Sequence, residues 1–181
     1  MNPTKQYLRK PPASAARNPE NRRIIGLDPG LAFSGWGVVE WDRRILRHVA
    51  HGCIETSPDI PHAERLLVIY RRFRAVLEGY APDESAMETL YFARNVTSAL
   101  MVAEARGVIA MTLAQQGLSV REFSPKVIKQ AVVGRGEADK AQVQEMVRVI
   151  LGLPAVPAPD HAADALGAAV CCAHTACWDR A

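Results

Sequence analysis

The sequence predicts an α/β domain in which a mixed sheet of five strands is flanked by helices. Strand-like apolar runs interleave with longer segments of helical period, in the order three strands, helix, strand, helix, strand and three helices. The chain has 181 residues, 49% of them hydrophobic. That is enough for one such domain to bury a core without disulfides or a structural metal.

The first three strands are predicted to form an antiparallel meander, since the polar turn at 41–44 joins the second to the third. The later two strands each stand between helices, which predicts a mixed sheet with helices on both faces. The five predicted strands cover residues 23–27, 35–40, 45–54, 85–90 and 118–123.

Five helices are predicted, and two of them have clear boundary signals. The first has apolar residues at helical spacing and stops before Pro82. Ser124 and Pro125 begin another, with serine as the N-cap and proline at the first helical position. The five predicted helices cover residues 61–80, 95–116, 125–133, 138–151 and 159–172.

The charge is unevenly distributed along the chain. Residues 1–23 carry a net charge of +5 and residues 24–181 carry −2, within a total of +3. A protein that coats nucleic acid by charge alone would carry the excess on its body, so that class is excluded. We predict a disordered basic tail over residues 1–21, a globular domain over 22–175 and a C-terminal tail over 176–181.

The composition also bears on location. No apolar run approaches the roughly 20 residues that span a bilayer. The basic start lacks the apolar segment of about 7–15 residues that a signal peptide needs. The four cysteines do not form a typical disulfide framework. We therefore expect a cytoplasmic protein without a membrane partner.

Two acidic residues are predicted at one edge of the sheet. Asp28 ends an apolar strand, and in α/β proteins the carboxyl edge of the sheet commonly holds the site. Asp before Pro29-Gly30 can equally cap a turn. Glu88 lies near the end of the strand over 85–90, which puts it level with Asp28. The alternative is a water-facing edge residue.

A second acidic cluster opens the last predicted helix. His161 and Asp164 are three residues apart and share a helical face. Acidic residues in a first turn also stabilise the helix dipole, and a lone histidine is often only a structural hydrogen-bonding group. That alternative accounts well for Asp160 and less well for Asp164, which has an Ala-rich apolar surround.

Carboxylates that converge raise one another's pKa unless a divalent cation lies between them. Oxygen ligands with one imidazole suit Mg²⁺ or Mn²⁺ better than Zn²⁺. Two such ions about 4 Å apart catalyse in-line displacement at phosphorus. The residues therefore predict phosphodiester hydrolysis.

Five collinear segments resemble the RuvC-type Holliday-junction resolvases over about residues 23–174. The segments are IIGLDPGLAFSGWGVV, METLYFARNVTSALMVAEARGV, VIKQAVVG, DKAQVQEMV and HAADALGAAV. The resemblance implies an RNase H-like fold and a homodimer that nicks two opposed strands of a four-way DNA junction in recombination and repair. It also implies ligatable 5′-phosphate ends and association with a branch-migration helicase complex.

The resemblance assigns roles to particular residues. The metal-binding catalytic positions fall on Asp28, Glu88, His161 and Asp164. At His161 the family accepts Asp or His, and both metal ligation and general-base catalysis remain open for the imidazole. Two ions of Mg²⁺ or Mn²⁺ are expected in each site.

DNA contacts are expected on both sides of these positions. The aromatic thought to probe the junction centre falls on Tyr91, beside Phe92, and the DNA-contacting lysines fall on Lys129 and Lys140. From the residues alone we add Arg94, in the same loop, and Arg135. Arg135 lies between Gly134 and Gly136, whose backbone N–H groups are expected to be open to phosphate.

Two other classes of function remain open. Asp28, Gly30 and Gly35 also match the start of the phosphate loop in sugar-kinase and actin-like ATPases, which generally require two such domains. The second is a junction-binding protein without nuclease activity, against which the competent ligands at every matched metal position argue.

Overall fold

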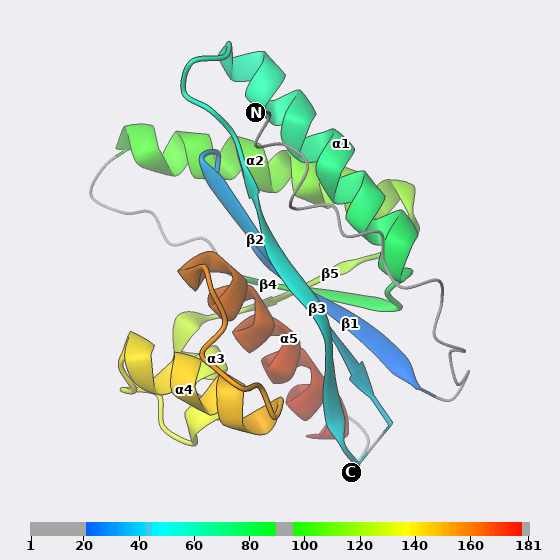
Figure 1. Cartoon of the computed structure of the whole chain (residues 1–181), viewed down its shortest axis with the longest axis vertical. Coiled ribbons are helices and arrows are strands. Elements are labelled where there is room, and N and C mark those ends of the chain that lie inside the picture. Colours follow the sequence, from blue (N-terminus) through cyan, green and yellow to red (C-terminus); the bar gives the residue numbers. More distant parts are fainter. Residues whose placement is uncertain (1–20, 43, 90–95, 179–181) are drawn as a thin grey trace.

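A computed structural model describes residues 21–42, 44–89 and 96–178 (Figure 1). Its sheet has five strands in the order β3-β2-β1-β4-β5. β1 pairs antiparallel with β2, and β2 with β3, whereas β1 with β4 and β4 with β5 run parallel. The strands are β1 (Arg22–Asp28), β2 (Phe33–Trp41), β3 (Leu46–Glu55), β4 (Glu84–Glu88) and β5 (Val120–Phe123).

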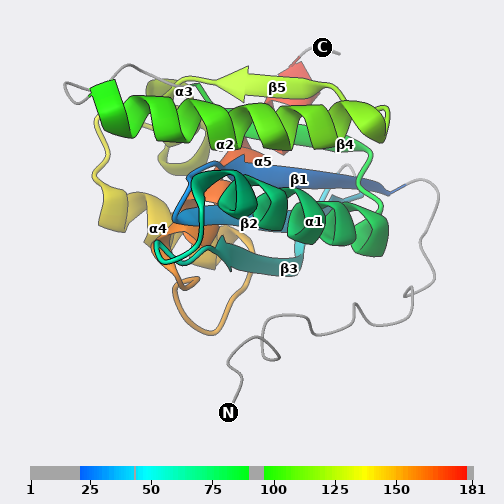
Figure 2. The same cartoon turned by 90° about the horizontal axis from the view of Figure 1, so that it is seen from above.

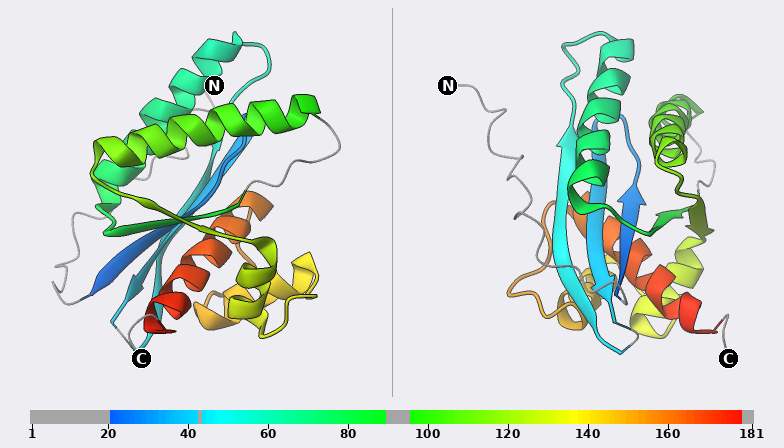
Figure 3. Two further views of the ribbon diagram at one scale, coloured as in Figure 1. Left: turned by 180° about the vertical axis from the view of Figure 1, so that it is seen from behind. Right: turned by 90° about the vertical axis from the view of Figure 1, so that its right-hand side faces the viewer.

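The helices cover both faces of this sheet (Figures 1 and 2). α1 and α2 lie on one face, and α3, α4 and α5 lie on the other (Figure 3). They are α1 (His62–Tyr80), α2 (Val96–Gln115), α3 (Pro125–Val133), α4 (Lys140–Ile150) and α5 (Asp160–Trp178). The predicted mixed five-stranded α/β architecture is confirmed.

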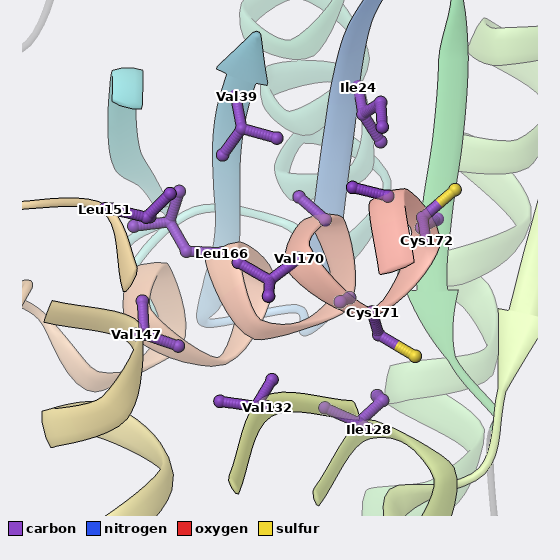
Figure 4. Close-up of a cluster of buried hydrophobic side chains, with 14 of the residues drawn as sticks. Ile24, Val39, Ile128, Val132, Val147, Leu151, Leu166, Val170, Cys171 and Cys172 are labelled. Atoms are coloured by element: carbon purple, nitrogen blue, oxygen red, sulfur yellow. The ribbon is translucent and has the colours of Figure 1, made fainter. Parts of the chain in front are cut away.

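The continuous apolar run of β1 has a simple cause, since both of its faces are buried. Ile24 packs into the cluster beneath α5, and the next residue, Ile25, packs into the cluster beneath α1 and α2. Figure 4 shows the cluster beneath α5, including Leu166 and Val170. Cys171 belongs to it as well, and burial raises the pKa of its thiol to about 12. This free cysteine is therefore a core residue with little thiolate at neutral pH.

Glycines on β1 and β2 let the backbone of α5 lie directly on the sheet. A Cβ added to Gly26 would overlap the carbonyl oxygen of Ala165, and one added to Gly35 would overlap that of His161. Buried alanines on α5 complete the close contact. This contact fixes where the first turn of α5 meets the edge of the sheet.

The predicted boundaries differ from the observed ones mainly at the last helix. α5 continues to Trp178 instead of ending near residue 172, because its apolar face stays buried through Ala173. The predicted start of α3 is confirmed, since the Ser124 side chain accepts from the Val127 N–H at 3.3 Å. None of the helices in the described part of the chain is long and apolar enough to cross a membrane.

Candidate active site

Asp28 and Glu88 end neighbouring parallel strands at the same edge of the sheet. Leu27 on β1 pairs with Met87 on β4, and the next residue on each strand is the acidic one. Arg106, on α2, donates from Nη1 to the carbonyl oxygen of Glu88 at 2.7 Å. The prediction that the two carboxylates stand at one level is confirmed.

The first turn of α5 brings His161 to Asp28. The His161 Nδ1 lies 2.7 Å from the Asp28 Oδ2. An ionised carboxylate only accepts hydrogen bonds, so Nδ1 is the donor, and in the neutral imidazole Nε2 keeps its lone pair. Phe33, at the start of β2, stacks on the His161 imidazole. The two ring centroids are 5.6 Å apart and the interplanar angle is 11°.

Lys140 joins α4 to the same turn of α5. Its Nζ lies 3.0 Å from the Asp164 Oδ2 and 3.2 Å from the Asp160 Oδ2. A capping box between Asp139 and Gln142 fixes the start of α4 and with it the position of Lys140. Asp164 is thus the acceptor of an ammonium ion from a neighbouring helix.

The carboxylates influence one another electrostatically. Burial raises the pKa of Asp28, the hydrogen bond and charge of His161 lower it, and the charge of Asp164 raises it. The side chain of Glu88 is exposed to solvent but partly desolvated by its neighbours, which raises its pKa, as do the charges of Asp28 and Asp164. Lys129 and Lys140 oppose that rise. The edge therefore concentrates negative charge that a cation would stabilise.

The donor set suits a hard divalent cation. Carboxylate oxygens with one imidazole are the ligands expected for Mg²⁺ or Mn²⁺. As the side chains stand, the described His, Cys, Asp and Glu residues include no group of three arranged to hold a metal ion. Asp28 and Asp164 are engaged instead by His161 and Lys140. Metal ligation would require these two contacts to change.

The predicted DNA contacts have mixed outcomes. Lys129, on α3, is near enough to Glu88 for its charge to lower the pKa of that carboxyl. Arg135 is exposed in the turn after α3. The Gly134 N–H donates to the Gln130 carbonyl oxygen at 3.0 Å and is not open to phosphate, contrary to expectation, because it caps α3. Tyr91, Phe92 and Arg94 lie outside the described residues.

Sequence reasoning missed three residues that shape the site. Phe33 is an exposed aromatic residue, and no motif around it in the sequence indicated a role at the site. Arg106 is one of many arginines. Gly35 was noticed only as a phosphate-loop glycine, whereas its role here is to admit the His161 backbone. A glycine inside an apolar strand was the available signal for such a close approach.

The sheet order and the acidic residues on β1, β4 and α5 define an RNase H-like domain. The family described as Crossover junction endodeoxyribonuclease RuvC matches residues 24–172. A crossover junction endodeoxyribonuclease RuvC from Chloroflexus aurantiacus is 51% identical, over 85% of this chain and 94% of the relative. The RuvC of Treponema denticola is 48% identical, over 86% of this chain and 89% of the relative. This chain therefore belongs to the RuvC family of crossover junction endodeoxyribonucleases.

Solved structures agree with this assignment. Thermus thermophilus RuvC superposes with a TM-score of 0.81 at 35% identity, covering 87% of this chain and 96% of that one. The same protein in complex with a Holliday junction substrate gives a TM-score of 0.83 at 35% identity, with the same coverage. The yeast mitochondrial Holliday junction resolvase Ydc2, at 13% identity and a TM-score of 0.62, shares the fold. Family membership implies dependence on a divalent metal.

Proposed function

We propose that this protein resolves four-way DNA junctions by nicking two opposed strands through metal-dependent phosphodiester hydrolysis, in recombination and DNA repair. The observation that carries the proposal is the convergence of Asp28, Glu88, His161 and Asp164 at one edge of the sheet, in a chain of this family. The solved complex of the Thermus thermophilus relative with a Holliday junction substrate supports the choice of DNA.

In this proposal Asp28, Glu88, His161 and Asp164 hold two ions of Mg²⁺ or Mn²⁺. Such ions, when bound, activate the attacking water and stabilise the leaving oxygen. In the free protein the hydrogen bond from His161 to Asp28 holds the imidazole at the site, and the ring nitrogen that this bond leaves open, Nε2, is the nitrogen available to accept a proton; ligation of Asp28 through Oδ2 releases Nδ1 as well. Phe33 restricts the ring further by stacking on it.

Basic residues around the carboxylates are proposed to bind the DNA backbone. Lys129 and Lys140 flank the acidic edge from α3 and α4, and Arg135 follows α3. Phosphate contacts of this kind position a duplex without reading its sequence. Tyr91, Phe92 and Arg94 follow Glu88 closely in the sequence, and we propose that the aromatic pair enters the junction centre.

An apolar stripe on α2 supports a symmetric homodimer. Its inner face is buried against the chain's own sheet, yet on its outer face Leu100 is 59% exposed and Met111 is 50% exposed. The exposed stripe consists of Leu100, Ala103, Gly107, Met111 and Ala114, which share one side of the helix. Among the described atoms none lies within 4 Å of a Cβ built on Gly107, which leaves room for a second α2. Two copies joined there would present two sites to opposed strands.

Three further parts of the proposal come from the family and the sequence. We propose a cytoplasmic protein that acts with a branch-migration helicase complex. We also propose that its nuclease domain covers residues 22–175, between a basic tail at 1–21 and a short tail at 176–181.

Mapping of cut positions tests this function. A mobile synthetic four-way junction, labelled on each strand in turn, is incubated with Mg²⁺ or Mn²⁺ and resolved on denaturing gels, with a linear duplex and EDTA as controls. We expect paired nicks at symmetric positions of opposed strands, which DNA ligase seals, and no comparable cleavage of the duplex. Junction binding without cleavage in either metal would favour the non-nuclease alternative. In a separate assay with ATP, metal-dependent ATP hydrolysis would favour the alternative of a sugar-kinase or actin-like ATPase.

A further inference from the structure

The ammonium group of Lys140 occupies the acidic edge in this structure. Its Nζ bridges Asp164 on one side and Asp160 on the other, at 3.0 and 3.2 Å. Its charge also lowers the pKa of Asp28 and of Glu88, so it acts on every acidic residue of the proposed metal site. A cation in this position stabilises the same negative charge that a divalent metal would stabilise.

We propose that Lys140 couples metal loading to DNA binding by exchanging between two partners, Asp164 in the free protein and a backbone phosphate in the DNA complex. The inference rests on the proposed function, because it takes the site residues as metal ligands and the substrate as DNA. In the free protein Lys140 competes with the metal. In the complex DNA removes that competitor.

Lys140 and a metal ion would compete for Asp164. The Oδ2 that accepts the lysine hydrogen bond is one of only two oxygens on this carboxylate, and metal ligation makes use of the same lone pairs. A divalent ion entering beside Asp28 and Glu88 is also repelled by the ammonium. Metal binding and the Lys140–Asp164 ion pair therefore oppose each other.

Lys140 can leave Asp164 without disturbing the fold. Its side chain is 53% exposed, and the capping box of α4 holds its backbone in place. A lysine has a flexible stem and a point charge that readily changes partner. The exposed Asp160 offers a second acceptor outside the proposed ligand set, so the ammonium can stay near the site after it releases Asp164.

Exchange of Lys140 would link the binding of metal to the binding of DNA. A phosphate that attracts Lys140 frees Asp164, and so DNA raises the affinity for metal; by thermodynamic necessity metal raises the affinity for DNA by the same factor. If Lys140 were only a structural ion-pair partner, the coupling between metal and DNA would be the same with and without its charge. The metal site would therefore be occupied mainly when DNA is bound.

The test compares wild-type protein with Lys140→Met, which keeps the length of the stem and removes the charge. Mn²⁺ binding to the DNA-free proteins is followed by electron paramagnetic resonance of the unbound ion. We expect Lys140→Met to bind Mn²⁺ about tenfold more tightly than wild type. Lys126→Met is the matched control, because the Lys126 side chain lies over Gly136 and is not part of the proposed metal site; it should leave the Mn²⁺ affinity unchanged.

A second measurement reports the coupling itself. Binding of a fluorescent four-way junction is measured by anisotropy with and without Ca²⁺. In wild type Ca²⁺ should raise the junction affinity severalfold, and in Lys140→Met that ratio should be smaller, because only the direct attraction between the bound cation and the phosphate remains. Lys140→Gln is the second variant should the methionine impair folding, as judged by circular dichroism.

The outcomes separate this inference from the function on which it rests. Equal Mn²⁺ affinity in wild type and Lys140→Met, with binding still lost in Asp164→Asn, would overturn the lysine exchange and leave the metal site intact. Mn²⁺ binding that is unaffected by Asp164→Asn would overturn both the exchange and the proposed metal site.

Discussion

Gly35 and His161 are in direct backbone contact, so that a Cβ on Gly35 would overlap the carbonyl oxygen of His161. This contact places the first turn of α5 on β2 and brings the His161 Nδ1 to 2.7 Å from Asp28. The geometry of the proposed site thus depends on a residue that has no side chain to contribute to it.

Gly35→Ala should consequently impair both folding and cleavage. We expect the free energy of unfolding to fall by roughly 1–3 kcal/mol, as for other overpacked sites. Displacement of His161 should slow junction cleavage about 100-fold. Urea unfolding and single-turnover cleavage measure the two effects. Gly167→Ala is the control, since the nearest described atom to its Cβ is 3.7 Å away; if both variants behaved alike, the close approach at Gly35 would not matter.

Asp28→Asn should separate cleavage from DNA binding. Asparagine keeps the shape of the side chain but is a poor ligand for a divalent metal, which contributes several kcal/mol to the transition state. Cleavage is therefore expected to fall about 10³-fold or more. Junction affinity in a gel-shift assay without divalent metal should stay within about threefold, because the proposed phosphate contacts are on other residues. Parallel loss of binding and cleavage would show that Asp28 acts through the structure.

Met111→Asp should convert the proposed dimer to a monomer. The charge would be placed on the exposed stripe of α2, away from the face that packs on the sheet. Burying an unpaired carboxylate at an interface is strongly unfavourable. Analytical ultracentrifugation is the measurement, and loss of paired nicking should accompany the change in mass. Glu78→Gln, at an exposed position on α1, is the control that should remain dimeric. A dimeric Met111→Asp protein would place the interface elsewhere.

Two histidines on β3 should make the protein less stable in acid. The His48 Nε2 lies 2.8 Å from the His51 Nδ1, and burial, with repulsion from His51, lowers the pKa of His48 to about 4. Burial also lowers the pKa of His51. In the unfolded chain a histidine takes up its proton near pH 6.5. Between about pH 6.5 and 4 the unfolded state thus binds more protons, and the stability that is complete above this range declines as the pH falls.

His48→Gln removes this contribution. Between pH 7 and 4.5 the variant should lose less stability than wild type by on the order of 1–2 kcal/mol, a value reduced for solvent screening at a half-buried site. Urea unfolding at the two pH values gives the difference. Titration of the acidic residues is common to both proteins and cancels in the comparison. A pH dependence of His48→Gln identical to that of wild type would refute the assignment.

The fold and half of the site were predictable because their signals are local. The apolar run before Asp28, the turn residues after it and the strand that ends at Glu88 are adjacent in sequence, and together they place both carboxylates at one edge. The pairing of Asp28 with His161 joins residues 133 positions apart. No periodicity reports such a contact, and only the resemblance linked these positions before the structure did.

The electrostatic partners were harder to predict. Lys140 was expected as a DNA contact, but its ion pair with Asp164 depends on how α4 docks against α5. The stacking of Phe33 on His161 depends likewise on the approach of α5 to β2. Side-chain contacts between separate elements follow from packing, which residue spacing along one element does not encode.

Asp28, Glu88, His161 and Asp164 are proposed to form one metal site, and anomalous diffraction from crystals grown with saturating Mn²⁺ would locate the bound ions. We expect anomalous peaks at this edge of the sheet, with carboxylate oxygens of Asp28 and Asp164 as direct ligands and Lys140 displaced from Asp164. Peaks elsewhere, with Asp28 still bonded to His161 and Asp164 to Lys140, would contradict this proposal.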